Sequence, residues 1–371
     1  MKNKDLKENE PVPTEDQRSA AGDLEEYIRQ GEPEKKEKVY LWRTAIGLQD
    51  TDGLRPSSYL IETARQNIEG KITIDEAKER IDRYYKERPV KDGTDRTEEA
   101  DKVSARITEI LSERAFTFSS TEYIGIHGRL FQGIYKFAGK IRDYNITKTE
   151  WVLGGKTVNF ASAGSISAAL EHDFDREKRF DYRTVGLSEA IRHIIGFVSD
   201  IWQIHAFGEG NTRTTAVFVI KYLRSFGFDV GNDIFAENAR YFRNALVRAN
   251  YNDIRNGIVA TKEYLERFFG NMLLGENNEL RSRSLHVSFK NVVSERTKVQ
   301  KQDAGDTGCT IDEHAILKFF RENPRATQKE AAVHINRSER TAKAITVALQ
   351  EKGLLERRNG RRNGYWAVGP E

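Results

Sequence analysis

The chain has 371 residues, of which 38% are hydrophobic and 32% charged, and its formal net charge is only +3. This length allows two or three domains, the composition is typical of a soluble, mostly helical protein, and the small net charge excludes a whole-molecule attraction to nucleic acid or membrane. The single cysteine, Cys309, excludes an internal disulfide and a cysteine-based zinc site and indicates a reducing compartment. The first residues lack the apolar core of a secretory signal, and no apolar run reaches about 18 residues, so we expect a cytoplasmic protein without a membrane segment.

Changes in composition divide the chain into five parts. The first is rich in Lys, Glu and Pro and has few large apolar residues, which favours a mobile or loosely helical arm. A polar stretch, SERTKVQKQDAGDTG, separates the helix-rich middle of the chain from a compact last unit. We therefore expect a polar arm over residues 1–38, an N-terminal helical region over 39–99, a helix-rich domain over 100–294, a linker over 295–308 and a C-terminal domain over 309–371.

Two helices are expected in the N-terminal helical region. Apolar residues from Leu60 to Ile68 recur at helical spacing, and Gly70 is placed to end that helix. Thr73 can cap the next helix, because Glu76 follows three residues later in a capping-box pattern.

One segment of the helix-rich domain favours a different structure. β-branched and aromatic residues flank Gly154 and Gly155, which is the pattern of a β-hairpin. We therefore predict a small hairpin between the helices of this domain.

The stretch HAFGEGNTRT, residues 205–214, lies between two apolar runs. Residues 191–201 and residues 216–223 both have apolar side chains at helical spacing, so the stretch is expected to join two buried helices. Its glycines and Asn211 then lie at the N-terminus of the second helix. Free backbone N–H groups and the helix dipole favour an anion at such a position.

Three side chains of this stretch suit phosphate chemistry. Arg213 is a forked donor for phosphate oxygens, and Glu209 could hold Mg²⁺, which takes one or two carboxylates together with phosphate oxygens. His205 could act as a general base near neutral pH. A core histidine beside an ordinary glycine turn would explain either feature alone, but a base, a carboxylate, an anion loop and an arginine at one joint favour function.

The same stretch resembles the signature of the Fic family, H-x-F-x-[DE]-G-N-x-R. The matching positions are His205, Phe207, Glu209, Gly210, Asn211 and Arg213. The likeness extends upstream into IHGRLFQGIYKFAGKIRDYNI and downstream into YFRNALVRANYNDIRNGI. The resemblance implies a mainly α fold, a Fic-type helical bundle with a small β-hairpin flap. It also implies transfer of AMP from ATP to a Ser, Thr or Tyr hydroxyl of a target protein, with release of pyrophosphate.

The resemblance assigns roles to individual residues. It implies that His205 deprotonates the target hydroxyl, that Phe207 anchors the loop and that Glu209 holds the Mg²⁺. The hairpin at Gly154 and Gly155 would align the target segment by strand addition. The implied nucleotide-binding set, in which Tyr241 would lie near the adenine, is Gly208, Glu209, Gly210, Asn211, Thr212, Arg213 and Tyr241.

Two positions depart from the family pattern. Thr212 stands where Gly is frequent, and Ala216 stands where many members have a second arginine that orients the terminal phosphate. Transfer of another nucleotide or phosphate-linked group therefore stays open.

The segment ARQNIEGKIT resembles the inhibitory helix of Fic proteins, [ST]-x-x-x-E-[GN]. Glu69 and Gly70 match, while Arg65 stands where Ser or Thr is usual. In the family this glutamate displaces the terminal phosphate of ATP, so the resemblance implies autoinhibition by Glu69. A Glu-Gly pair that merely ends a helix is the alternative.

The C-terminal domain has the layout of a winged helix-turn-helix. Thr327 with Glu330 predicts the start of a second helix, Ser338 the start of a third, and Asn359-Gly360 the turn of a wing hairpin. The basic residues expected to contact the phosphates of duplex DNA are Arg340, Lys343, Arg357, Arg358, Arg361 and Arg362. A protein-docking module is the alternative.

These patterns favour a protein adenylyltransferase over a DNA-binding regulator whose Fic domain only senses a nucleotide. A sensor would need the anion loop and the arginine, but it would not need a base. The presence of both His205 and Glu209 therefore favours the enzyme.

Overall fold

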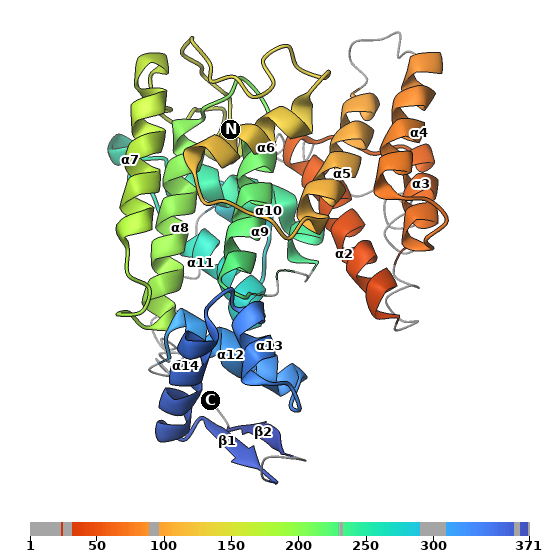
Figure 1. Ribbon diagram of the computed structural model, residues 1–371. Coiled ribbons are helices and arrows are strands. Elements are labelled where there is room, and N and C mark those ends of the chain that lie inside the picture. The colour runs from red at the N-terminus through yellow and green to blue at the C-terminus, as the bar shows by residue number, and fades with distance from the viewer. Residues whose placement is uncertain are drawn as a thin grey trace. The chain divides into compact units, whose positions relative to one another are not determined.

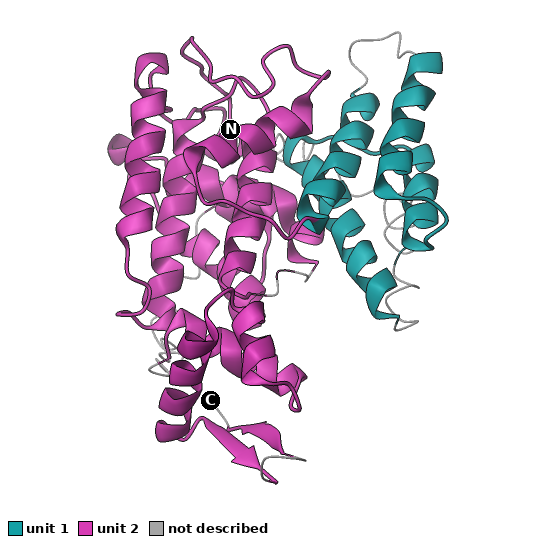
Figure 2. Cartoon of the chain, viewed as in Figure 1, with its two compact units in different colours: residues 1–112 teal, residues 113–371 magenta. Residues whose placement is uncertain are grey.

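The described residues of the computed structural model form α-helices with one two-stranded antiparallel sheet (Figure 1), as the mainly α prediction requires. None of the described helices is long and apolar enough to cross a membrane. The chain divides into two compact units, residues 1–112 and residues 113–371 (Figure 2). The structure describes residues 24, 32–88, 96–228, 230, 233–289, 309–359 and 364–369.

The first unit is a group of helices around a core that includes Trp42, Leu60 and Ile81. Its elements are α2 (Pro33–Gly47), the 3₁₀ helix η1 (Leu48–Asp52), α3 (Ser58–Ile68), α4 (Ile74–Glu87) and α5 (Thr97–Ser112).

The helices of the first unit extend on both sides of the range 39–99. Helix α2 begins at Pro33, inside the range predicted for the polar arm, because proline has the right φ for a first helical turn and lacks only an N–H that a first turn leaves unpaired. Helix α5 packs against α2 and α4 and belongs to the first unit, which extends to residue 112. The apolar face of α5, with Val103 and Ile107, is buried in this unit.

The predicted pair of helices around Gly70 is confirmed. Helix α3 ends at Ile68, and Gly70 follows with a φ of 75°, a left-handed conformation that glycine adopts without strain. Thr73 and Glu76 form the predicted capping box at the start of α4.

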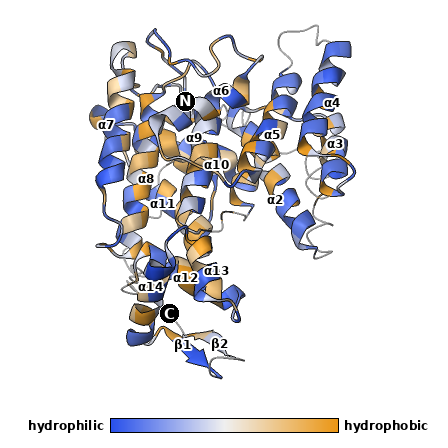
Figure 3. Ribbon diagram, in the orientation of Figure 1, coloured by the Kyte–Doolittle hydropathy of each residue, from blue (hydrophilic) through white to orange (hydrophobic). Residues whose placement is uncertain are grey.

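The second unit is built around α9, which is buried on every side. All residues from Asn211 to Leu223 are buried, as expected of a helix surrounded by other helices. Helices α6 and α8 pack along α9, and α8 is hydrophobic over much of its length (Figure 3). The helices of this part are α6 (Ser120–Phe131), α7 (Ile166–Arg179), α8 (Leu187–Ile204), α9 (Asn211–Ser225), α10 (Ile234–Ala249) and α11 (Glu263–Phe269). Shorter elements are η2 (Trp151–Leu153), η3 (Ala163–Ser165), η4 (Ile254–Asn256), the π-helical turn η5 (Gly270–Leu274) and η6 (Ser282–Leu285).

The hairpin predicted at Gly154 and Gly155 is present only as one closing bridge, without regular paired strands. The segment has one isolated antiparallel bridge, Glu150 with Lys156, and a 3₁₀ turn between them. The reason is that two consecutive apolar residues, Val152 and Leu153, are both buried. A strand would send them to opposite faces, whereas a helical turn places both against the protein interior.

Three helices and an antiparallel hairpin follow in the order predicted for the last part of the chain. They are α12 (Ile311–Glu322), α13 (Gln328–His334), α14 (Glu339–Glu351), β1 (Leu355–Arg358) and β2 (Tyr365–Val368), with Arg358 paired to Tyr365. The predicted caps at Thr327 and Ser338 are both present. The Asn359-Gly360 turn lies partly outside the described residues, and the expected linker lies wholly outside them.

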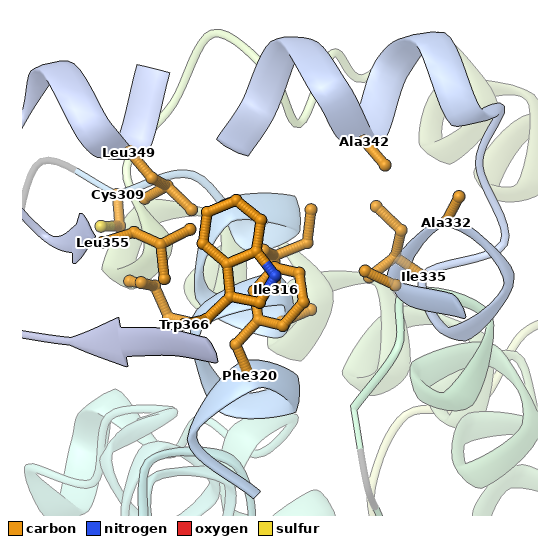
Figure 4. Close-up of a cluster of buried hydrophobic side chains, with 12 residues drawn as sticks. Cys309, Ile316, Phe320, Ala332, Ile335, Ala342, Leu349, Leu355 and Trp366 are labelled. Atoms are coloured by element: carbon orange, nitrogen blue, oxygen red, sulfur yellow. The ribbon is translucent and has the colours of Figure 1, made fainter. Parts of the chain in front are cut away.

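This C-terminal part has its own apolar core (Figure 4). Trp366 stacks on Phe320, with ring centroids 4.8 Å apart, and its indole N–H donates to the carbonyl of Ala326 at 3.1 Å. The core therefore ties the hairpin to the first helix of this part, α12.

Candidate active site

The loop between α8 and α9 starts and ends in the left-handed conformation. His205 follows α8 with a φ of 50°, and Gly210 precedes α9 with a φ of 77°. A positive φ is uncommon for a residue with a side chain, and such residues concentrate at functional sites. The predicted joint of two buried helices is confirmed, with His205 at one end and the N-terminus of α9 at the other.

The imidazole of His205 is buried without a hydrogen bond of normal geometry to a described residue. The residue is 3% exposed, and the backbone of Trp202 is the one described hydrogen-bonding group that raises its pKa. Burial, with help from the cations of Lys148 and Arg142, holds the pKa of His205 well below its usual range. The ring is therefore neutral at physiological pH and has an unused lone pair, as a general base requires.

Arg142 holds the backbone on which His205 sits. Its Nε donates to the carbonyl of His205 at 2.8 Å, and its Nη1 donates to the carbonyl of Tyr144 at 2.6 Å. The backbone N–H of Arg142 also donates to the carbonyl of Ala206 at 2.9 Å. These bonds fix the turn that aims His205, a role that the sequence analysis did not assign to Arg142.

Phe207 and Asn211 stabilise the loop through buried contacts. The ring of Phe207 is buried, as predicted for an anchor. The side-chain amide of Asn211 accepts from the Phe207 N–H at 3.0 Å and donates to the Phe207 carbonyl at 2.8 Å. Because the Asn211 amide is used within the loop, its contribution to an anion site would come from its backbone N–H at the start of α9.

His127, a residue absent from the predicted site, supports the same loop. Its ring stacks on Phe207 with centroids 3.7 Å apart. Its Nδ1 accepts from the Gly139 N–H at 2.9 Å, so Nε2 carries the proton and donates to the carbonyl of Glu209 at 3.1 Å. Burial lowers the pKa of His127 to about 4, so the ring stays neutral and keeps this hydrogen-bonding pattern.

The carboxylate of Glu209 pairs with a lysine that the sequence analysis also missed. Nζ of Lys148 lies 2.8 Å from Oε2 of Glu209, and the two side chains are 25% and 33% exposed. The described residues contain no group of three or more His, Cys, Asp or Glu side chains placed to hold a metal. One carboxylate beside a helix N-terminus fits a Mg²⁺ ion that brings phosphate oxygens as its other ligands.

Thr212 and Arg213 are held by aromatic side chains. The indole N–H of Trp202 donates to Oγ1 of Thr212 at 3.0 Å, so the hydroxyl of Thr212 is paired inside the protein. The guanidinium of Arg213 is buried and lies 4.8 Å from the centre of the Phe131 ring. Its Nη2 is 3.4 Å from the hydroxyl of Tyr135.

Two glycines of the loop lie directly under aromatic side chains. A Cβ on Gly208 would meet the hydroxyl of Tyr144, and a Cβ on Gly210 would overlap the ring of Phe131. Glycine is therefore required at Gly210, where the Phe131 ring is buried and φ is positive, whereas a Cβ at Gly208 would displace the exposed side chain of Tyr144.

Tyr241, the predicted adenine neighbour, is buried in α10. It is 2% exposed, its ring lies nearly parallel to that of Phe268 at 6.5 Å, and its hydroxyl has no hydrogen-bond partner among the described residues. Burial raises its pKa above the usual range. The contact with adenine stays a prediction.

The remaining predicted residues lie elsewhere. Glu69 follows the last residue of α3, and its carboxylate pairs with Nζ of Lys71 at 2.5 Å. Arg340 and Lys343 are exposed on α14. Arg357 lies over the Trp366 ring, and Arg358 pairs with Glu356 at 2.8 Å. Two further arginines, Arg361 and Arg362, lie outside the described residues.

The geometry of this loop agrees with a comparison against protein families. Residues 117–223 match the model of the Fic/DOC family, and this range contains α6 to α9 and the whole His205 loop. The chain therefore carries a Fic/DOC family domain. Members of this family generally transfer AMP or related nucleotide-phosphate groups, with proteins as their targets.

Proposed function

We propose that this protein is an adenylyltransferase that moves AMP from ATP to a Ser, Thr or Tyr hydroxyl of a target protein. The observation that carries the proposal is the buried ring of His205, whose nitrogens have no hydrogen bond of normal geometry to a described residue. A structural histidine at such a depth would be paired, because an unpaired buried polar group is costly. A general base, in contrast, needs a free lone pair for its substrate.

The reaction is one displacement at the α-phosphorus of ATP. A ring nitrogen of His205 takes the proton of the target hydroxyl, and the oxygen forms a bond to the α-phosphorus. The bond from that phosphorus to the bridging oxygen breaks, and pyrophosphate leaves. The low pKa of His205 makes the ring available as a base at neutral pH, although it also makes it a weaker base than a free imidazole.

The rest of the loop suits the binding of phosphates. The backbone N–H groups at the start of α9 and the positive end of its dipole would hold phosphate oxygens. The guanidinium of Arg213 would add a fixed positive charge near the distal phosphates. Glu209 would hold Mg²⁺, which supplies neutralisation of the developing charge on the leaving pyrophosphate.

Labelled ATP tests the proposal directly. The full chain is incubated with Mg²⁺ and ATP labelled at the α- or the γ-phosphate, with cell extract as a source of targets, and modified proteins are identified by mass. We expect the α-label alone to be incorporated, with an added mass of one AMP. Incorporation of the γ-label, or a preference for another nucleotide, would contradict transfer of AMP. It would favour transfer of a different nucleotide or phosphate-linked group, the alternative that Ala216 leaves open.

The C-terminal part supports a second candidate function, binding of duplex DNA as a winged helix. Its three helices and hairpin have the order of such a domain, and Arg340 and Lys343 are exposed on the third helix, α14. Replacement of both by Ala should weaken DNA binding and reduce the slope of affinity against salt by about two, since each lost phosphate contact removes about one unit. Arg321→Ala on α12 is the control. If the intact chain does not bind duplex DNA at low salt, this candidate is wrong.

A further inference from the structure

Lys148 brings a positive charge to the loop at residues 205–210 from another part of the chain. Lys148 belongs to the segment between α6 and α7, and it is 61 residues away from Glu209 in the chain. Its backbone N–H donates to Oγ1 of Thr157 at 3.2 Å, which holds this part of the segment in place. Its Nζ lies 2.8 Å from a carboxylate oxygen of Glu209. A separate segment thus delivers an ammonium group to the loop.

The ammonium group of Lys148 can change partners more easily than other cations near the loop, because those cations are held by the surrounding protein. The guanidinium of Arg213 is buried and packs over Phe131, while Arg142 is occupied with backbone carbonyls. Position 216 has the uncharged Ala216, where many Fic proteins have a second arginine. Lys148 is one-quarter exposed, and a lysine has a flexible stem and three donors that can change partners.

The carboxylate of Glu209 can accept either Lys148 or a divalent cation, but the two compete. Both are positively charged, and the approach of one disfavours the other at the same oxygens. An ion pair that is partly exposed on both sides contributes little stability, so a divalent cation bound to phosphates can displace the lysine. The lysine then remains within reach of the same phosphates.

We propose that Lys148 is the second cation of the phosphate site. It neutralises Glu209 when no divalent cation is bound, and it turns to the phosphates of the nucleotide when a divalent cation takes Glu209. This inference rests on the proposed function, because it assumes that the loop binds a nucleoside triphosphate. It assigns to Lys148 the charge that position 216 lacks.

The proposal predicts opposite effects for the two partners on ATP binding in the absence of metal. Affinities are measured by calorimetry on the full chain, with ATP in EDTA and with ATP in MgCl₂. Lys148→Met leaves the charge of Glu209 uncompensated in EDTA and removes the phosphate contact in MgCl₂, so it should weaken ATP binding on the order of tenfold in both buffers. Glu209→Gln frees the lysine and should strengthen metal-free binding, while it reduces the gain that Mg²⁺ brings.

Two further variants separate this role from a general effect on folding. Lys156→Met removes another lysine of the same segment, which pairs with Asp253, and it should leave both affinities within twofold of the wild type. Lys148→Arg should retain metal-free binding because it keeps the charge. Thermal unfolding of every variant confirms that each is folded.

The outcomes distinguish this proposal from the proposed function. Equal affinities of wild type and Lys148→Met for ATP in MgCl₂, with ATP bound by both, overturn the role of Lys148 alone. The opposite shifts in Lys148→Met and Glu209→Gln, without any transfer of AMP, support Lys148 and contradict only the transfer reaction. A wild-type chain that binds no ATP in either buffer overturns both.

Discussion

The loop at residues 205–210 and the segment at residues 143–149 meet at Glu209, yet they are held in different ways. The loop is fixed by buried contacts, with Phe207 stacked on His127 and Asn211 bonded twice to the Phe207 backbone. Every residue of the segment is exposed or half-buried, and the segment reaches Glu209 through the partly exposed ion pair of Lys148.

This difference separates two tasks of a phosphate-transfer site. A base and an anion cradle must keep their geometry, because a displacement of the reacting groups is costly in rate. A segment that admits a target protein and a metal-bound nucleotide must change conformation, so its contacts must break and form again. The buried loop suits the first task and the weakly paired segment suits the second.

Removal of the base should have the largest effect. His205→Ala is expected to lower AMP transfer by 10²–10⁴-fold, which is typical of the loss of a general base, while ATP binding is retained. Transfer is measured with α-labelled ATP and binding by calorimetry. His172→Ala, at an exposed position on α7, is the control and should transfer at the wild-type rate. Near wild-type transfer by folded His205→Ala would falsify the mechanism.

The rigidity of the loop can be tested at Gly210. A side chain there must adopt a positive φ, which costs about 1–2 kcal/mol, and must also displace the buried Phe131 ring, which costs a further 1–3 kcal/mol or so. Gly257→Ala is the matched control, because Gly257 has a φ of 69° but has open space around its Cα. Urea unfolding followed by tryptophan fluorescence should show the larger loss for Gly210→Ala. Equal losses would mean that Phe131 does not constrain the loop.

The buried histidine under the loop predicts a pH dependence of stability. The pKa of His127 is about 4 in the folded protein and near 6.5 in an unfolded chain, so the unfolded chain binds the proton first as the pH falls. Stability is intact above pH 6.5 and is lost progressively between 6.5 and 4, by about 2 kcal/mol between pH 7 and pH 5.

The variant His127→Gln tests this contribution. It should be less stable at pH 7, because the stacking on Phe207 is lost, but its free energy of unfolding should fall by about 2 kcal/mol less between pH 7 and pH 5. The drop would not vanish, since the pKa of His205 is also low in the folded protein. An unchanged drop would show that His127 is not buried in the neutral form.

The two segments also differ in how far the sequence could predict them. The helical spacing of apolar residues and the position of the glycines are local signals, and they placed α8, α9 and the loop between them correctly. Lys148 and His127 act on Glu209 from 61 and 82 residues away in the chain. No local pattern relates a lysine or a histidine to a partner at that distance, so only the folded chain shows these contacts.

The reduction of the predicted hairpin to one bridge has a related cause. β-branched residues around two glycines are a frequent local signal for paired strands, but the burial of both Val152 and Leu153 requires a helical turn. Tertiary packing decided the conformation against the local preference. The segment kept one bridge, and this loose connection leaves Lys148 on a stretch without a regular strand.

The smallest expected effect concerns Glu69, which lies in the other compact unit. We propose that its carboxylate competes with the terminal phosphate of ATP, as the likeness to the inhibitory helix implies. The helix end that this requires is present, because α3 stops at Ile68 and Gly70 turns the chain. Glu69→Gly should therefore raise self-modification with AMP. Since Ala216 leaves the carboxylate without the arginine that usually holds it, we expect an increase on the order of tenfold, or about 1.4 kcal/mol in barrier.

A second glutamate on the same helix controls for loosening of the fold. Glu62→Gly also places a glycine in α3, where it weakens the helix by about 1 kcal/mol, but it removes a carboxylate that pairs with Arg65. If the charge of Glu69 causes the inhibition, Glu69→Gly and Glu69→Gln both activate transfer, and Glu62→Gly does not. Activation by Glu62→Gly to the same degree would mean that any weakening of α3 is sufficient. Equal AMP incorporation by wild type and Glu69→Gly, with both folded and binding ATP, would show that α3 is not inhibitory and would leave the transfer reaction unaffected.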